Sequence, residues 1–205
     1  MTGDARRHAP ATARNREPIL AVLRRVLPPR GLVLEVASGT GQHVAHFAAT
    51  LGPGLFFQPS DPSAEARASI DAWIAASGVV NVAPALELDA SAPVWPVTSA
   101  DAILCINMVH ISPWSATVGL LAGAGRILPA GGPLVLYGPY RRNGAHTADS
   151  NAAFDRSLRA ENPAWGVRDL EAVVALAREE GFAAPEIVEM PANNLGVILR
   201  RGART

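Results

Sequence analysis

The sequence of 205 residues contains no lysine and a single cysteine, Cys105. Without lysine, the chain cannot form a Schiff base, anchor pyridoxal phosphate or supply the lysine of a phosphate-binding P-loop. One cysteine excludes an internal disulfide and a zinc site built from several cysteines. No run of about 18 apolar residues is present, and no apolar stretch follows the basic N-terminus. We therefore expect no membrane span, no signal peptide and a cytoplasmic location.

The charge balance is even, with 18 basic residues, all arginine, against 18 acidic residues and a pI of about 7.0. Proteins that bind nucleic acids usually concentrate lysine and arginine to neutralise phosphates. The neutral balance therefore predicts neither a nucleic-acid nor a membrane partner, and the oligomeric state stays open. The acidic residues are dispersed along the chain, so we predict no metal site.

Segments with strand and helix character alternate along most of the chain. We expect strands at residues 32–36, 55–57, 82–88, 101–107, 133–137, 186–190 and 195–199. Helical spacing of apolar residues between most of them predicts an α/β fold, with a mostly parallel sheet of seven strands and helices on both faces. Only a short link separates the last two strands, so the last strand should be antiparallel. We predict a flexible arm at residues 1–14 and one domain over 15–205, with an insertion at about 138–168.

The loop after the first predicted strand has the composition of a ligand-binding turn. Glycine at positions 39 and 41 permits positive φ and close approach of a ligand to the backbone. The helix that follows presents free N–H groups at its start. The candidate residues here are Glu35, Ala37, Ser38, Gly39 and Gly41. A tight strand-to-helix turn without a ligand would have a similar composition.

Acidic side chains end the next two predicted strands. Asp61, before Pro62, lies about 20 residues after the glycines, where a carboxylate can accept hydrogen bonds from both hydroxyls of a ribose. It could also cap the next helix. Asp89, before Ala90, is suited to an adenine amino group. Val44 stands where a dinucleotide-binding loop has its third glycine, so an adenosine with an amino-acid tail fits better than a pyrophosphate.

These features together resemble the class I S-adenosylmethionine-dependent methyltransferases. Residues 35–41 resemble their first motif, in which Ala37 replaces the usual first glycine, and residues 128–132 resemble their turn before the fifth strand. Asn107 and Met108 resemble the position near the methionine moiety. Residues 14–20, 37–43, 58–61, 107–114, 137–140, 150–155, 165–169 and 190–194 are together similar to the methyltransferase-like 26 family. The resemblance implies a single-domain Rossmann-like methyltransferase fold with S-adenosyl-L-methionine as cofactor.

His110 is the best-placed titratable group for catalysis. It lies three residues beyond Asn107, and the usual pKa of histidine suits a general base near neutral pH. A histidine after a strand can equally cap a helix or pack beside Trp114, so both roles stay open.

Candidate acceptor-binding residues come from the helix before the first strand, from the predicted insertion and from the last turn. They are Asn15, Arg16, Trp114, Tyr140, Asn151, Asp155, Trp165, Arg168 and Asn194. An arginine at position 16 could hold a carboxylate, or lie on a solvated helix face. Arg168 could instead pair with Asp169, Asn194 could belong to a simple turn, and the aromatic residues could belong to the core.

The sequence thus predicts a methyltransferase for a small-molecule acceptor. A non-catalytic S-adenosylmethionine-binding protein that works through a partner is the alternative, and a nicotinamide-dependent oxidoreductase is less favoured because the third glycine is absent. The sequence does not choose among oxygen, nitrogen, sulfur and carbon acceptors.

Overall fold

A computed structural model describes residues 4–203 and contains one central sheet of six strands. Its first four strands in spatial order are parallel to one another. The last strand in sequence, β8, is antiparallel to both of its neighbours, as predicted. The spatial order is β2 (Leu55–Ser60), β1 (Gly31–Val36), β3 (Ala102–Ile106), β4 (Pro133–Gly138), β8 (Asn194–Arg200) and β7 (Glu186–Met190).

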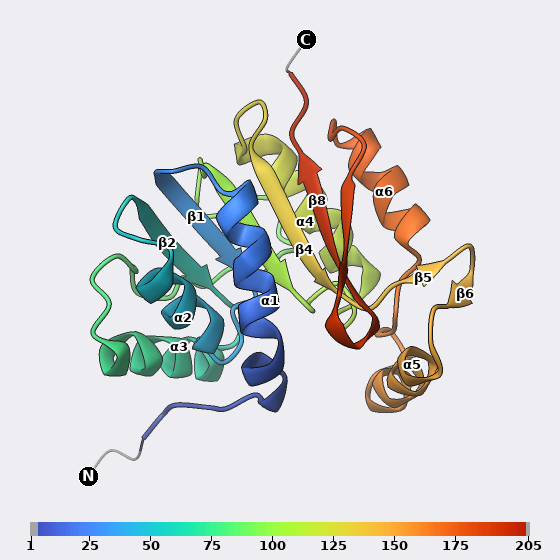
Figure 1. Ribbon diagram of the computed structural model, residues 1–205, viewed down its shortest axis with the longest axis horizontal. Coiled ribbons are helices and arrows are strands. Elements are labelled where there is room, and N and C mark those ends of the chain that lie inside the picture. The colour runs from blue at the N-terminus through green and yellow to red at the C-terminus, as the bar shows by residue number, and fades with distance from the viewer. Residues whose placement is uncertain (1–3, 204–205) are drawn as a thin grey trace.

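Helices cover both faces of the sheet, with α1 in front of it and α4 behind it in Figure 1. The sheet has a hydrophobic core on each face, and successive residues of β1 contribute to both. Val33 packs with α1 and α2 on one face, and Leu34 packs with α4 and α6 on the other. This division explains why β1 reads as a continuous apolar run, since a strand buried on both faces has no polar side. The helices are α1 (Pro10–Val26), α2 (Gln42–Thr50), α3 (Ala64–Ser77), α4 (Trp114–Ile127), α5 (Asp149–Glu161) and α6 (Leu170–Glu179).

The predicted strand at residues 82–88 is wrong, and with it the seventh strand. This segment runs beside β2 but meets it only at two isolated bridges, Phe57 with Val82 and Ser60 with Leu86. The register shifts by one residue between the bridges. Pro59 in β2 and Pro84 in the segment cannot donate backbone hydrogen bonds, so a continuous ladder cannot form between them.

At the N-terminus, α1 begins at Pro10, within the arm predicted at residues 1–14. Pro10 suits a first helical position because its missing N–H would have no partner there. Residues 10–14 are therefore helical. The flexibility predicted for residues 1–14 stays a prediction, and residues 1–3 lie outside the described part of the chain.

The predicted insertion contains a two-stranded hairpin, β5 (Arg141–Arg142) with β6 (Ala145–His146), followed by α5. The hairpin and α5 lie on the β7 side of the molecule in Figure 1. A short 3₁₀ turn, η1 (Pro191–Asn193), joins β7 to β8.

Within residues 4–203, no helix is long and apolar enough to cross a bilayer. In the same part of the chain, no three histidine, cysteine or acidic side chains converge as a metal site would require.

Candidate cofactor and acceptor site

The loop after β1 contains three residues in the left-handed region, Ala37 (φ 57°), Gly39 (φ 60°) and Gly41 (φ 87°). Only glycine adopts this region without a steric cost, so Ala37 carries a local strain of about 1 kcal/mol. A Cβ atom at Gly41 would lie 2.6 Å from the Cα of Ile70 in α3. Gly41 is therefore required both by its backbone conformation and by the close packing of the loop against α3.

Asp61, at the end of β2, holds this loop in place. Its Oδ2 accepts a hydrogen bond from the Gly39 amide at 3.0 Å, and its Oδ1 accepts one from the Ser63 amide at 3.0 Å. Next to it, the Ser38 amide donates to the Ser60 carbonyl at 2.8 Å. Because an ionised carboxylate has about four acceptor positions, Asp61 retains capacity for further donors. Its side chain also contributes to a cavity.

This cavity of about 380 Å³ lies at the carboxyl ends of β1, β2 and β3. Asp61 and Asp89, predicted as ribose and adenine contacts, both line it. The Asp89 carboxylate accepts hydrogen bonds from the Ser91 amide at 2.8 Å and from the Ser91 hydroxyl at 2.7 Å. The lining consists of Val36, Ala37, Asp61, Pro62, Leu88, Asp89, Ala90, Ser91, Met108, Ile111, Ser112, Pro113, Ser115 and Ala116.

Several of these residues were not predicted from the sequence, namely Val36, Leu88, Ser91, Ile111, Ser112, Pro113, Ser115 and Ala116. The available signal was position, because they lie next to or a few residues after the predicted residues 37, 89–90 and 107–108. Of the predicted cofactor residues, Ala37, Asp61, Pro62, Asp89, Ala90 and Met108 line the cavity. Ser38, Gly39 and Gly41 shape the loop beside it, whereas Glu35 and Asn107 do not line it.

Glu35 lies fully buried near the end of β1, and its Oε2 has no hydrogen-bond partner. Burial raises the pKa of Glu35 to about 7, the Ser38 hydroxyl lowers it, and the charge of Asp61 raises it. A buried carboxylate with an unused oxygen is costly unless it is protonated or meets a donor. Below about pH 7, Glu35 is therefore largely protonated, which avoids the cost of burying its negative charge.

Replacing Glu35 with glutamine should alter how stability depends on pH. In the folded chain the raised pKa means that unfolding releases a proton, so this group's contribution to stability falls as pH rises from about 4.5 to about 7. The stability of Glu35→Gln relative to the unsubstituted protein should therefore increase by about 3 kcal/mol between pH 4 and pH 8. Urea denaturation across this range measures it. The control Glu65→Gln changes an exposed side chain and should show no such trend. If the stability difference between Glu35→Gln and the unsubstituted protein did not change with pH, the burial assigned to Glu35 would be contradicted.

Asn107, the first residue after β3, adopts a left-handed conformation with φ 64°. The turn that it begins directs His110 inward, and the imidazole is fully buried. Burial, together with the charge of Arg168, lowers the pKa of His110 to about 3. Its Nε2 has no partner and faces Gly138, where a Cβ atom would lie 2.6 Å from that nitrogen. His110 is therefore neutral at pH 7 and has no contact with solvent.

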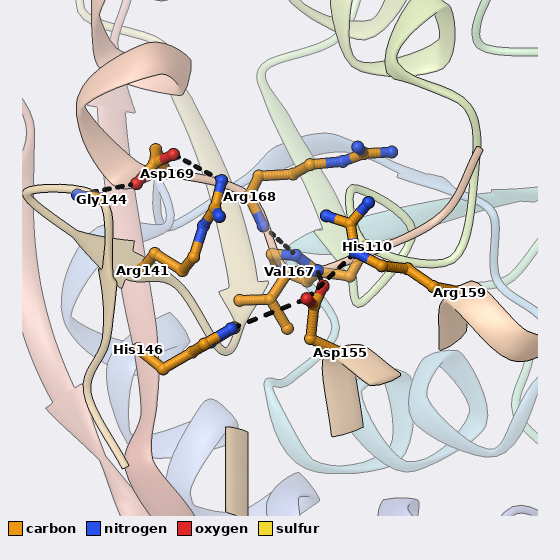
Figure 2. Close-up of polar contacts among 9 residues, drawn as sticks. All are labelled: His110, Arg141, Gly144, His146, Asp155, Arg159, Val167, Arg168 and Asp169. Atoms are coloured by element: carbon orange, nitrogen blue, oxygen red, sulfur yellow. Dashed lines mark hydrogen bonds and ion pairs between the residues drawn. The ribbon is translucent and has the colours of Figure 1, made fainter. Parts of the chain in front are cut away.

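Residues 166–168 of the predicted insertion are bound by His110 from the loop after β3 and by Asp155 from α5 of the insertion itself (Figure 2). The Arg168 amide donates to Nδ1 of His110 at 3.4 Å, and the His110 carbonyl accepts from the Gly166 amide at 3.0 Å. From α5, Asp155 accepts a hydrogen bond from the Val167 amide at 2.7 Å. These bonds hold residues 166–168 from two sides, so the described environment of His110 is that of a structural contact between segments.

Besides Asp155, four of the predicted acceptor residues gather around this contact. The Arg168 guanidinium donates to the carbonyl oxygens of Val109, Ser112 and Ala164, and lies 5.8 Å from the ring centre of Trp114. The ring of Tyr140 is fully buried 4.8 Å from that of His110, and its hydroxyl has no partner. Trp165 is half-buried in the fastened segment. Arg168 does not pair with Asp169, which instead binds Arg141.

The other predicted acceptor residues lie in separate places. Asn151 donates to the Asn193 carbonyl at 2.9 Å and so joins α5 to η1, and Asn194 donates to carbonyl groups within that turn. On α1, the buried Asn15 side chain contacts Nε2 of His43 at 2.8 Å. Arg16 is exposed, with Glu17 as its neighbour at 3.7 Å.

Taken together, the residues around the cavity fit an adenosine ligand with a positively charged tail. Asp61 has free acceptor positions for hydroxyl groups, and the glycine loop leaves room for close approach of a ligand. Glu35 supplies a buried oxygen without a partner. This fit rests on the chemistry of the donors and acceptors present.

The fold is that of the class I methyltransferases, as comparison with solved structures shows. An O-methyltransferase family protein from Burkholderia thailandensis aligns with a TM-score of 0.80 at 18% identity, over 95% of this chain and 58% of that one. An O-methyltransferase family 2 protein from Planctomyces limnophilus, solved with apigenin, gives 0.76 at 18%, over 93% and 60%. Human N-acetylserotonin methyltransferase, solved with S-adenosylmethionine, gives 0.74 at 16%, over 94% and 53%. The chain thus spans little more than half the length of these proteins.

The sequence itself belongs to the family described as "Protein of unknown function (DUF938)", whose family model matches residues 6–201. This match covers nearly the whole chain.

Proposed function

We propose that this protein is an S-adenosylmethionine-dependent methyltransferase that acts on a small-molecule acceptor. The observation that carries the proposal is the cavity of about 380 Å³ lined by Asp61 and Asp89, beside a left-handed glycine loop at the carboxyl ends of the strands. Ligands of open α/β sheets bind at this edge. The similarity to solved methyltransferase structures supports the proposal. The sequence motifs similar to the methyltransferase-like 26 family add to that support.

In this proposal, Asp61 accepts hydrogen bonds from the ribose hydroxyls, and Asp89 binds the adenine amino group with Ala90 and Met108 beside the ring. The loop of Ala37, Ser38, Gly39 and Gly41 lies along the ligand backbone, with Pro62 closing the ribose side and Asn107 near the amino-acid tail. Glu35 stabilises the positive charge from beneath the loop. The cofactor, when bound, supplies an electrophilic methyl group.

The chain's own contribution is to orient the acceptor and to exclude water. Correct positioning of two reactants is worth on the order of 7–11 kcal/mol. Trp114, Tyr140 and Trp165 are proposed to enclose the acceptor, with Arg168 fixing the segment that carries Trp165. Asn15, Arg16, Asn151, Asp155 and Asn194 are proposed as further acceptor contacts, each from its own place on α1, on α5 or in the turn at η1.

A role for His110 as general base belongs to the same proposal. Its Nδ1 accepts a hydrogen bond from the Arg168 amide, so the neutral ring carries its proton on Nε2. Nε2 can act as a base toward an acceptor beside Gly138 only if that proton first moves to Nδ1, which breaks the bond from Arg168. A base with so low a pKa transfers protons weakly, however. The low pKa and complete burial favour the second candidate function, a non-catalytic protein that binds S-adenosylmethionine and works through a partner.

Calorimetry and a transfer assay separate these functions. We expect S-adenosylmethionine and its demethylated product to bind and nicotinamide dinucleotides not to bind; the reverse pattern would reject the proposal. Transfer of a labelled methyl group to members of a panel of phenols, carboxylic acids, amines and thiols would establish the enzyme. Binding with no transfer would favour the second candidate. If His110→Asn keeps more than a tenth of the rate, His110 is not the base.

A further inference from the structure

The segment of residues 4–9 lies against the helix that packs on the cofactor loop, and it is bound at two points. The Arg7 amide donates a hydrogen bond to the Ser69 hydroxyl of α3 at 2.8 Å. The Ala9 amide donates to Oε1 of Gln42, the first residue of α2, at 2.7 Å. We name residues 4–9 the N-terminal strap.

Both attachment points lead to the same residue of the loop. The Ser69 hydroxyl, fully buried, donates in turn to the Thr40 carbonyl at 2.8 Å. Oε1 of Gln42 also accepts from the Thr40 hydroxyl at 3.2 Å. Thr40 stands between Gly39 and Gly41, so the strap contacts the loop through one intermediate side chain on each side.

Trp73 of α3 provides a third attachment. Its indole Nε1 donates to the Arg7 carbonyl at 2.9 Å. The Arg6 guanidinium lies 5.3 Å from its ring centre, and the His8 ring lies edge-on at 5.0 Å. The strap is therefore held by side chains of α3 and α2, whereas its own side chains lie largely at the surface.

We propose that the N-terminal strap positions the cofactor loop, with Ser69 as the positioning residue between them. When the strap is bound, the Ser69 hydroxyl has both a donor and an acceptor, which fixes its direction toward Thr40. When the strap leaves, the hydroxyl loses its donor and can rotate, and Gln42 loses one of its two partners. A glycine-containing loop has more conformations to lose than other loops, so tethering Thr40 favours the conformation that receives a ligand.

Strap binding and ligand binding are consequently coupled, and each should strengthen the other by the same factor. The loss of one such hydrogen bond corresponds to a change of roughly fivefold. The ligand half of this inference rests on the proposed function. The inference that the strap positions the loop does not depend on the proposed function.

Arg7→Pro tests the coupling because proline removes the backbone donor to Ser69 and leaves every residue of the site unchanged. Arg7→Ala keeps the donor, and Ala5→Pro introduces a proline where no bond is lost. In the ligand-free protein, we expect Arg7→Pro to speed hydrogen exchange of the Gly39 and Gly41 amides roughly fivefold, with an unchanged urea midpoint. Both controls should behave as the unsubstituted protein.

The double variant Arg7→Pro/Trp73→Ala releases two anchors and should enlarge the effect. Unchanged loop exchange in the double variant would overturn the proposal, whether or not the strap amides themselves exchange faster. Affinity for the demethylated cofactor product should fall by the same factor as loop exchange rises. If the unsubstituted protein binds no such nucleoside, the proposed function fails, while the exchange result still decides whether the strap positions the loop.

Discussion

Asp61→Ala should weaken binding of S-adenosylmethionine by roughly 10²–10⁴-fold. The carboxylate is proposed to accept two ribose hydroxyl groups, and each hydrogen bond to a charged acceptor contributes about 1.5–3 kcal/mol. The same carboxylate accepts the amides of Gly39 and Ser63 at 3.0 Å. Its removal therefore also loosens the loop that shapes the site.

Two further variants separate these contributions. Asp61→Asn retains one acceptor oxygen without the charge, so its loss should be intermediate. Glu65→Ala removes an exposed acid four residues away and should leave affinity unchanged. Calorimetric titration with the demethylated product measures all three. An affinity within threefold of the original for Asp61→Ala would refute the ribose assignment.

The position of the cavity could be predicted from the sequence because it depends on local order. In an α/β fold with parallel strands, each strand end comes to the same edge of the sheet, so Asp61 after β2 and Asp89 after the segment 82–88 were expected to lie close together. This expectation holds although the segment 82–88 meets β2 only at isolated bridges, and both side chains line the cavity. The loop at Gly39 and Gly41 was predictable for the same reason, since glycine marks positive φ.

What could not be predicted depends on contacts between distant segments. The seventh strand was expected from apolar residues at 82–88, but two prolines on different segments interrupt its pairing with β2. The complete burial of His110 results from Gly138 and Gly166. No periodicity near position 110 indicates contact with those residues.

The Ser69 hydroxyl was missed for a related reason. Its place in α3 is predictable from helical spacing, and a small residue on a buried helix face is usually read as packing. Its bonds to Arg7 and Thr40 span 62 and 29 residues of sequence. These two hydrogen bonds can be recognised only in the folded structure, in which α3 packs against the loop.

Acidification should lower the stability of the protein because two histidines are buried in neutral form. Burial and the charges of His46 and Arg16 lower the pKa of His43 to about 4, and burial and Arg168 lower that of His110 to about 3. Both folded-state values lie below the unfolded value of 6.5. The unfolded chain therefore binds more protons below that pH, and stability falls as pH falls.

Each histidine should contribute about 1.4 kcal/mol per pH unit between its unfolded and folded pKa. Domains of ordinary stability have about 5–15 kcal/mol in total, so acidification should lower stability markedly by pH 4 and unfold such a domain only below about pH 4. Glu35 acts in the opposite direction, because its folded pKa of about 7 makes its own contribution larger at low pH. From pH 6.5 down to about pH 4, the fall in stability per pH unit should therefore be close to that of one histidine. Near pH 4, Glu35 becomes protonated in both the folded and the unfolded chain and no longer offsets the histidines.

Single variants distinguish the two histidines. His43→Asn and His110→Asn should each lose stability at pH 7 through altered packing, yet each should reduce the pH slope by about one proton. The control His8→Asn changes an exposed imidazole and should leave the slope intact. Urea midpoints at intervals from pH 8 to pH 4 measure the slopes. A slope that persists in both buried-site variants would show that acid sensitivity arises elsewhere, and that neither imidazole is held neutral by burial.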